Sequence, residues 1–140
     1  MAELKTAVRY FSKSGNTKKV AVAIAEAAKC ESKSIPEPVA GNVDILFLGA
    51  SVYWGGVASE VKDYIKTIEA AKVKKVVVFS TSALAQRAFP SIKKLLQKQG
   101  IEVDEDNFYC RGQFTAMHKG RPNDDDLAAA AKFAKSKLKG

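Results

Sequence analysis

The sequence predicts an α/β protein built on a doubly wound, parallel β-sheet of five strands. Apolar strand-like segments alternate with helical segments along the whole chain, an order that is typical of repeated βαβ units. The strand-like segments near the middle of the chain are nearly continuous in apolar residues, as expected for strands that helices cover on both faces. A chain of 140 residues with 46% hydrophobic residues can bury an ordinary core without disulfides or metals. We therefore predict a single domain over residues 1–140.

The first half of the chain contains three predicted strands and two predicted helices. In chain order these are a strand at residues 6–11, a helix at 16–29, a short edge strand at 31–35, a strand at 43–49 and a helix at about 59–71. Each helix has apolar residues at helical spacing on one face, such as Val20, Ile24 and Ala27 in the first helix. Pro36 and Pro38 interrupt regular structure, so the second crossover helix is predicted to be shortened or absent.

The second half of the chain contains two further strands and two further helices. Residues 75–80 form a strand rich in β-branched residues. Pro90 fits the first turn of the next helix and Gly100 its end, because proline suits a helix start and glycine a helix stop. A last strand lies within residues 102–112, and the final helix begins near Asp124. Three consecutive aspartates at that point suit a helix N-terminus, where negative charge is favourable.

The turn between the first strand and the first helix has the composition of a phosphate-binding loop. It consists of Ser12, Lys13, Ser14, Gly15, Asn16 and Thr17. Such a turn offers backbone N–H groups and hydroxyls at a helix N-terminus, where the helix dipole adds partial positive charge. No carboxylate occurs between Glu3 and Glu26, and Lys18 and Lys19 follow the turn directly. The plainer alternative is a turn that Ser14 or Thr17 caps without any ligand.

The order Ser12, Ser14, Gly15, Thr17 resembles the phosphate loop of the flavodoxin family, which wraps the phosphate of flavin mononucleotide (FMN). A second segment, residues 49–56, resembles the family's aromatic flavin loop. The resemblance implies the strand order 2-1-3-4-5 and FMN as the cofactor. It also implies flavin contacts from the loop residues Ser51, Val52, Tyr53, Trp54, Gly55 and Gly56. Of the two aromatic residues, Trp54 is the better candidate for stacking on the flavin ring and Tyr53 the second.

A third loop, residues 80–89, is predicted to lie beside the first two, because the carboxyl ends of parallel strands share one edge of a sheet. Its predicted cofactor-binding residues are Ser80, Thr81, Ser82 and Leu84. Many flavodoxins have more acids and a second aromatic residue here, so either Leu84 or Phe89 is expected to cover the other face of the flavin. No acid occurs in any of the three loops. Because nearby negative charge disfavours an anion, we expect the reduced, anionic flavin to be tolerated better than in acidic flavodoxins.

Composition restricts the partners and the location of the protein. The net charge is +8, but the lysines are spread over every predicted helix and do not interleave with aromatic residues as in an RNA-binding sheet. We expect no nucleic acid and instead redox partner proteins with acidic docking surfaces. The sequence has no apolar run of the roughly 20 residues that span a bilayer and no signal peptide, so we expect a cytoplasmic protein without a membrane span. Cys30 and Cys110 form no CxxC motif and fit reduced thiols, and a lone histidine, His118, indicates no metal site.

The sequence contains no recognisable catalytic constellation, and we predict no catalytic residue. With a single histidine, no Ser/His/Asp or Cys/His set is apparent. Cys110 is expected to be buried, and residues 120–123 are expected to form a structured turn. The resulting interpretation is a flavodoxin-like carrier that binds one FMN and passes electrons between larger enzymes, with the chemistry supplied by the cofactor. Two alternatives stay open: an FMN-dependent quinone or flavin reductase, and a flavin-free interaction module.

Overall fold

The computed structural model describes residues 4–12, 15–39, 41–53, 56–57, 59–82, 88–111, 120 and 122–138. The strands are β1 (Thr6–Tyr10), β2 (Ser32–Ser34), β3 (Val43–Tyr53), β4 (Gly56–Val57), β5 (Val73–Ser82) and β6 (Val103–Arg111). The helices are α1 (Asn16–Ala28), α2 (Ser59–Thr67), α3 (Ala88–Lys98) and α4 (Asp124–Leu138). Strands and helices therefore alternate, except from β2 to β4, where three strands follow one another in the chain.

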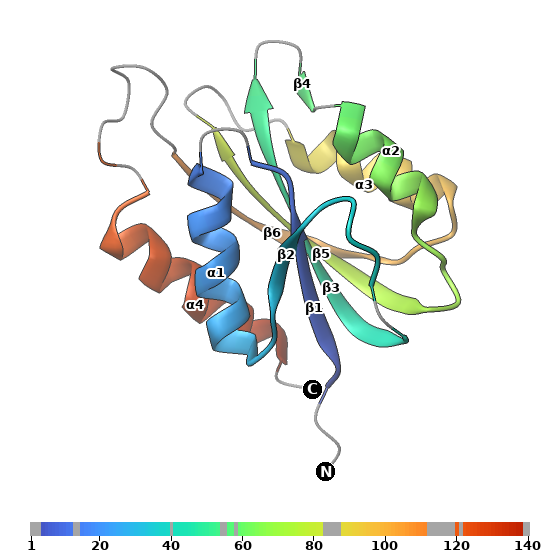
Figure 1. Ribbon diagram of the computed structural model, residues 1–140, viewed down its shortest axis with the longest axis horizontal. Helices are drawn as coiled ribbons and strands as arrows, with labels where there is room; N and C mark the ends of the chain where they lie inside the picture. Colours follow the sequence, from blue (N-terminus) through green and yellow to red (C-terminus); the bar gives the residue numbers. More distant parts are fainter. Residues whose placement is uncertain are drawn as a thin grey trace.

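The sheet has the order β2-β1-β3-β5-β6, and each of these neighbours pairs in parallel. The predicted order 2-1-3-4-5 is thereby confirmed, with one addition: the two-residue β4 pairs antiparallel with the end of β3. Helices α1 and α4 cover one face of the sheet, and α2 and α3 cover the other (Figure 1). The chain moves from β1 outward to β2 and then crosses back to β3. The point at which its direction reverses lies between β1 and β3, which is where doubly wound folds bind ligands.

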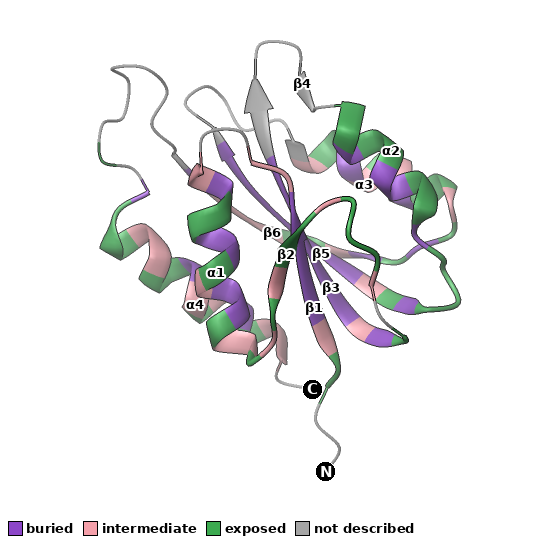
Figure 2. Ribbon diagram, in the orientation of Figure 1, coloured by how far each residue is buried: buried purple, intermediate pink, exposed green. Residues whose placement is uncertain are grey.

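A hydrophobic core lies between the sheet and the helices on each of its two faces. The central strands are therefore buried on both sides (Figure 2). One core combines Leu46 and Val78 with Val61 of α2 and Ile92 of α3. The other core combines strand residues such as Phe47 and Phe79 with residues of α1 and α4. Successive residues of β3 and β5 alternate between the two cores, because side chains of a strand point to opposite faces in turn.

The connection from β2 to β3 contains no helix among its described residues, which are all those between the two strands except residue 40. This confirms the prediction made from Pro36 and Pro38. The buried Arg9 of β1 holds the connection instead. Its guanidinium donates from Nε to the carbonyl oxygen of Glu37 and from Nη2 to that of Pro38, each over 2.9 Å. Tyr64 of α2 donates to the same Glu37 oxygen over 2.9 Å.

Several boundaries differ from the predicted ones. Helix α2 ends at Thr67 rather than near residue 71, because the chain tightens after it: the N–H of Ile68 donates to the carbonyl of Ile65 over 3.1 Å. The side chain of Ile68 is still buried, which is why the apolar stripe suggested a longer helix. Strand β3 continues to Tyr53, four residues past the predicted end, since it gains pairing with both β5 and β4.

The ends of the last two helices agree with the predictions. Pro90 lies in the first turn of α3, and the N–H of Ile101 closes its far end by donating to the carbonyl of Leu96 over 3.1 Å. At the start of α4, Asn123 Oδ1 accepts from the N–H of Asp126 over 2.9 Å while Asp126 Oδ2 accepts from the N–H of Asn123 over 2.8 Å. This reciprocal pair is a capping box, so the described part of the segment 120–123 is a structured helix start, as expected.

Candidate functional site

The three predicted loops begin at one edge of the sheet. Tyr10, the last residue of β1, is paired with Gly49 of β3, and Ser51 of β3 is paired with Thr81 of β5. The carboxyl ends of these three strands therefore lie side by side, at the upper edge of the sheet in Figure 1. Strands alone thus bring together segments that lie some tens of residues apart in the chain.

The first loop enters α1 through a glycine in the left-handed region. Gly15 is the N-cap of α1 with φ +90°, a conformation that costs a residue with a Cβ roughly 1–2 kcal/mol. Its N–H donates to Ser12 Oγ over 3.0 Å, and its carbonyl accepts from the N–H of Lys19 over 3.1 Å. Gly15 has no side chain of its own, and no side-chain hydrogen bond caps the helix among the described residues. Lys13 and Ser14 lie outside the described residues.

The charge around the start of α1 favours an anion. The first turn of α1 contains no acidic residue, whereas Lys18 and Lys19 are both exposed there. Two cations at a helix N-terminus oppose the helix dipole, and this unfavourable arrangement becomes favourable when an anion sits at the helix end. The contrast with α4 is direct, because α4 begins with three aspartates and a capping box.

Thr17 and Thr81 meet beneath this edge. Their hydroxyl oxygens are 2.8 Å apart although the residues are separated by 64 positions in the chain. Thr17 is fully buried and Thr81 is 2% exposed. Sequence reasoning assigned both residues to the cofactor site but did not foresee that they bond to each other.

Ser80, the residue before Thr81, is buried and points to the opposite face of β5. Its hydroxyl has no hydrogen-bond partner among the described residues. A buried hydroxyl without a partner costs free energy, so such a group at a strand end is a natural place for a ligand or water to bind.

The second and third loops are described only in part. Ser51, Val52, Tyr53 and Gly56 belong to strands β3 and β4, where Val52 pairs with Val57 and Tyr53 with Gly56. The described part of the predicted loop therefore belongs to an antiparallel pair of strands, and Trp54 and Gly55 lie outside the described residues. Ser82 ends β5, and Leu84 lies outside the described residues. Phe89 packs against the core under α2 and α3, with Lys93 Nζ 5.7 Å from the centre of its ring.

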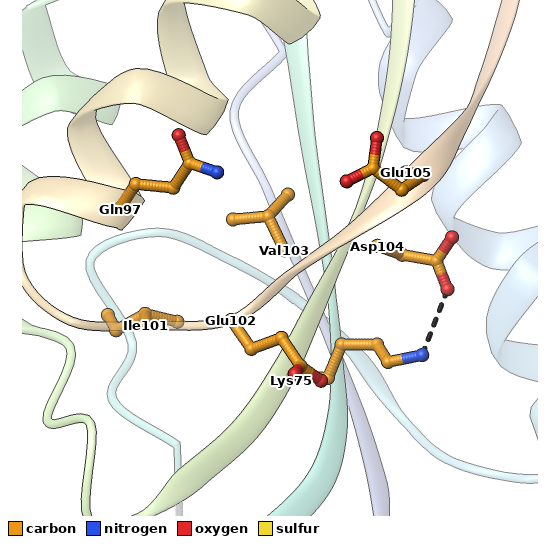
Figure 3. Close-up of a pocket in the computed structure, with 7 residues that line it drawn as sticks. All are labelled: Lys75, Gln97, Ile101, Glu102, Val103, Asp104 and Glu105. Carbon is orange, nitrogen blue, oxygen red and sulfur yellow. Dashed lines mark hydrogen bonds and ion pairs between the residues drawn. The ribbon is translucent and has the colours of Figure 1, made fainter.

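The hollow drawn in Figure 3 lies away from the three predicted loops. It has a volume of about 470 Å³ and is lined by residues near the amino ends of β5 and β6, the edge of the sheet opposite the three loops. Lys75 Nζ lies 3.1 Å from Asp104 Oδ2 there, and Lys137 Nζ of α4 lies 3.0 Å from the other oxygen of Asp104. Partial burial alone would raise the pKa of Asp104, but the hydrogen bonds from the Asp106 N–H, Lys137 and Lys75 outweigh it and hold the pKa below its usual value. The ion pair between Lys137 and Asp104 joins α4 to the sheet.

A metal site requires a group of ligating side chains, and a helix that spans a membrane must be long and apolar. Within the described ranges, no group of three or more histidine, cysteine, aspartate or glutamate side chains is arranged to hold a metal ion. In the same ranges, no helix has the length and apolar character needed to cross a membrane. Cys110 is buried, as the sequence indicated.

Sequence reasoning missed Arg9. It lies in a strand that is otherwise apolar apart from Thr6, and a charged residue inside such a strand is the signal that could have drawn attention to it. Its three acceptors are all backbone carbonyls, the third being that of Val8, 2.9 Å from Nη1. Carbonyl acceptors leave no trace in the sequence, so its role became visible only in the fold.

Known proteins resemble this chain over most of its length. The family model described as Flavodoxin domain matches residues 7–115. An uncharacterized protein of Methanocaldococcus jannaschii is 28% identical over 143 aligned positions, which cover 89% of this chain and 91% of that protein. A solved flavodoxin from the domain Archaea has a TM-score of 0.78 at 18% identity and covers 98% of this chain and all of that one. A flavoprotein of Lactobacillus acidophilus, solved in complex with FMN, has a TM-score of 0.63 at 20% identity, covering 77% of this chain and 93% of that one.

Proposed function

Because the chain belongs to the flavodoxin domain family, we propose that it binds one FMN noncovalently at the carboxyl ends of β1, β3 and β5 and carries electrons between redox proteins. The observation that carries the proposal is the start of α1. A left-handed glycine forms the N-cap, no side-chain hydrogen bond caps the helix among the described residues, and two lysines but no acid occupy its first turn. This arrangement fits a phosphate group.

The residues at this edge suit the separate parts of FMN. We assign the phosphate to the residues that precede and begin α1 in the chain, namely Ser12, Lys13, Ser14, Gly15, Asn16 and Thr17. We assign the flavin ring to the residues Ser51, Val52, Tyr53, Trp54, Gly55 and Gly56 of the second loop, and to Ser80, Ser82 and Leu84 of the third loop. The buried Ser80 hydroxyl supports this assignment, because it has no partner among the described residues.

When bound, FMN would supply the redox chemistry, and the protein would supply position and electrostatics. No side chain near this edge is needed as an acid or a base. The net charge of +8 supports partner proteins with acidic docking surfaces, since complementary charge speeds encounter and sets orientation. We also propose a cytoplasmic location, where free thiols such as those of Cys30 and Cys110 stay reduced.

An absorbance titration tests the proposal. The purified protein is mixed with FMN, and we expect flavin bands that remain with the protein after gel filtration at one flavin per chain. A protein that stays colourless after this treatment would contradict the proposal and favour a flavin-free interaction module. Oxidation of a reduced nicotinamide by the pure, flavin-loaded protein at steady state would instead favour a reductase.

Gly15→Val tests the phosphate loop, and Gly41→Val is its matched control. Both glycines have positive φ and open space where a Cβ would be, but Gly41 lies at the amino end of β3, far from the site. Loss of hydrogen bonds to a charged group is worth about 1.5–3 kcal/mol, or roughly ten- to a hundredfold in affinity. We expect Gly15→Val to weaken FMN by this factor and Gly41→Val to leave it unchanged. Equal effects of the two variants would show that backbone strain, not the site, is responsible.

A further inference from the structure

The buried contact between Thr17 and Thr81 connects the first turn of α1 to the end of β5. The two hydroxyl oxygens are 2.8 Å apart, and neither side chain is more than 2% exposed. Transfer of a hydroxyl into a protein interior is unfavourable unless it is hydrogen-bonded, so each threonine offsets the cost of burying the other. The contact is thus a specific polar link within an otherwise apolar layer.

Thr81 is oriented for this link by the alternation of the strand. Val77 and Phe79, which share its face of β5, pack in the core under α1 and α4. The side chain of Thr81 therefore lies on the α1 side of the sheet, and its hydroxyl reaches the first turn of that helix. Ser80 points to the other face and makes no such contact.

A threonine hydroxyl has one proton to donate and two lone pairs to accept with. When Thr81 donates to Thr17 Oγ1, the hydroxyl proton of Thr17 is directed away from Thr81. An anion can only accept, so a phosphate at the start of α1 requires this direction of the bond. Thr81 would then hold Thr17 in the rotamer and proton orientation that a phosphate needs.

We propose that Thr81 is a positioning residue: it fixes the first turn of α1 through the Thr17 hydroxyl and so strengthens binding of the FMN phosphate without touching the cofactor. This proposal rests on the proposed function and deepens it. It replaces direct cofactor binding by Thr81, the role expected from the sequence, with an indirect one.

Affinities for FMN and for riboflavin, which lacks the phosphate, separate the two roles. The variants are Thr81→Val, which keeps the shape and removes the hydroxyl, and Thr81→Ser, which keeps the hydroxyl. We expect Thr81→Val to lower the affinity for FMN about three- to tenfold, which corresponds to the loss of one hydrogen bond. Riboflavin binding should change less than twofold, and Thr81→Ser should match the wild type for both ligands. An equal loss of FMN and riboflavin affinity would overturn the proposal, because it would mean that Thr81 contacts the flavin or supports the whole site.

A double-mutant cycle adds a second test. If Thr81 acts through Thr17, Thr81→Val has no further effect on FMN affinity in a Thr17→Val background. The double variant replaces both hydroxyls by methyl groups, and removing both partners together is close to neutral for folding. We therefore expect the double variant to recover stability relative to the single variants but not FMN affinity. Additive losses of affinity would overturn the proposal.

Hydrogen exchange in the flavin-free protein provides a readout that does not depend on binding. Thr81→Val should speed amide exchange at the start of α1, residues 16–20, whereas Thr81→Ser should not. Unchanged exchange in Thr81→Val would overturn the positioning role. A wild-type protein that binds neither FMN nor riboflavin would overturn the proposed function and the positioning role together. If the wild type binds FMN but Thr81→Val binds it equally tightly, only the positioning role is overturned.

Discussion

Replacing Arg9 by leucine should destabilise the fold through the connection between β2 and β3. Arg9 is 5% exposed, and its guanidinium donates to three carbonyl oxygens, two of which belong to Glu37 and Pro38 in that connection. The connection contains no helix among its described residues, so the arginine provides anchoring that a second crossover helix would otherwise provide.

The size of the effect follows from these bonds. A hydrogen bond from a charged donor is worth about 1.5–3 kcal/mol, and two such bonds hold residues 37–38. Removal of a buried cation also removes its desolvation cost, which offsets part of the loss. Glu37 keeps its bond from the Tyr64 hydroxyl. We therefore expect Arg9→Leu to lower the free energy of unfolding by about 2–4 kcal/mol, a large share of the roughly 5–15 kcal/mol typical of domains.

Urea unfolding followed by circular dichroism measures this change. Arg9→Lys is the informative second variant, because a lysine keeps the charge but cannot present donors to three carbonyls in the geometry of the guanidinium. We expect Arg9→Lys to be destabilised nearly as much as Arg9→Leu. A loss below about 1 kcal/mol in Arg9→Leu would refute the reasoning, because the three bonds would then contribute no more than an ordinary surface contact.

Three further predictions concern the same connection, the ion pairs and the flavin site. Tyr64→Phe removes one neutral hydrogen bond to Glu37 and should cost about 0.5–1.5 kcal/mol in the same urea assay, with less than additive loss when it is combined with Arg9→Leu. Asp104→Asn should destabilise the protein at neutral pH. Because the folded-state pKa of Asp104 is lowered, the difference in unfolding free energy between wild type and Asp104→Asn should be complete above the ordinary carboxyl pKa of about 3.9. It should disappear as the pH falls through the lowered pKa. Glu105→Gln, which removes an exposed ion pair, should change the unfolding free energy very little. For the FMN-loaded protein, the potential of the second reduction step should be less negative than in acidic flavodoxins and should become more negative as salt screens the lysines. In a potentiometric titration, the double variant Lys18→Gln/Lys19→Gln should shift the potential as added salt does, whereas the control Lys132→Gln/Lys135→Gln in α4 should not. A potential that changes neither with salt nor in the Lys18/Lys19 variant would contradict the assignment of FMN to the start of α1.

The hydrophobic pattern by itself determined the class and order of the elements. Buried strands such as residues 43–49 are recognisable because both faces must be apolar, and α1 because its apolar residues repeat at helical spacing. Pro36 and Pro38 predicted that the connection from β2 to β3 has a shortened or absent helix, since proline interrupts regular structure over a few residues. The proposed phosphate loop could also be predicted from the sequence, because its glycine, hydroxyls and lysines are contiguous. These features depend on interactions within about ten residues of the chain.

Tertiary structure alone decided which distant groups meet. Thr17 and Thr81 are 64 residues apart, and Arg9 lies 28 residues from Glu37, so their contacts depend on strand order, register and side-chain face together. The end of α2 and the extension of β3 were misjudged for the same reason: the apolar stripe continues to Ile68 although the helix stops, and β3 lengthens because β4 and β5 supply partners. A one-residue change of register would turn Thr81 away from α1 and Arg9 away from residues 37–38, because successive side chains of a strand point to opposite faces. Local sequence therefore determines the elements and their chemistry, while the contacts that hold the site in place exist only once the sheet has assembled.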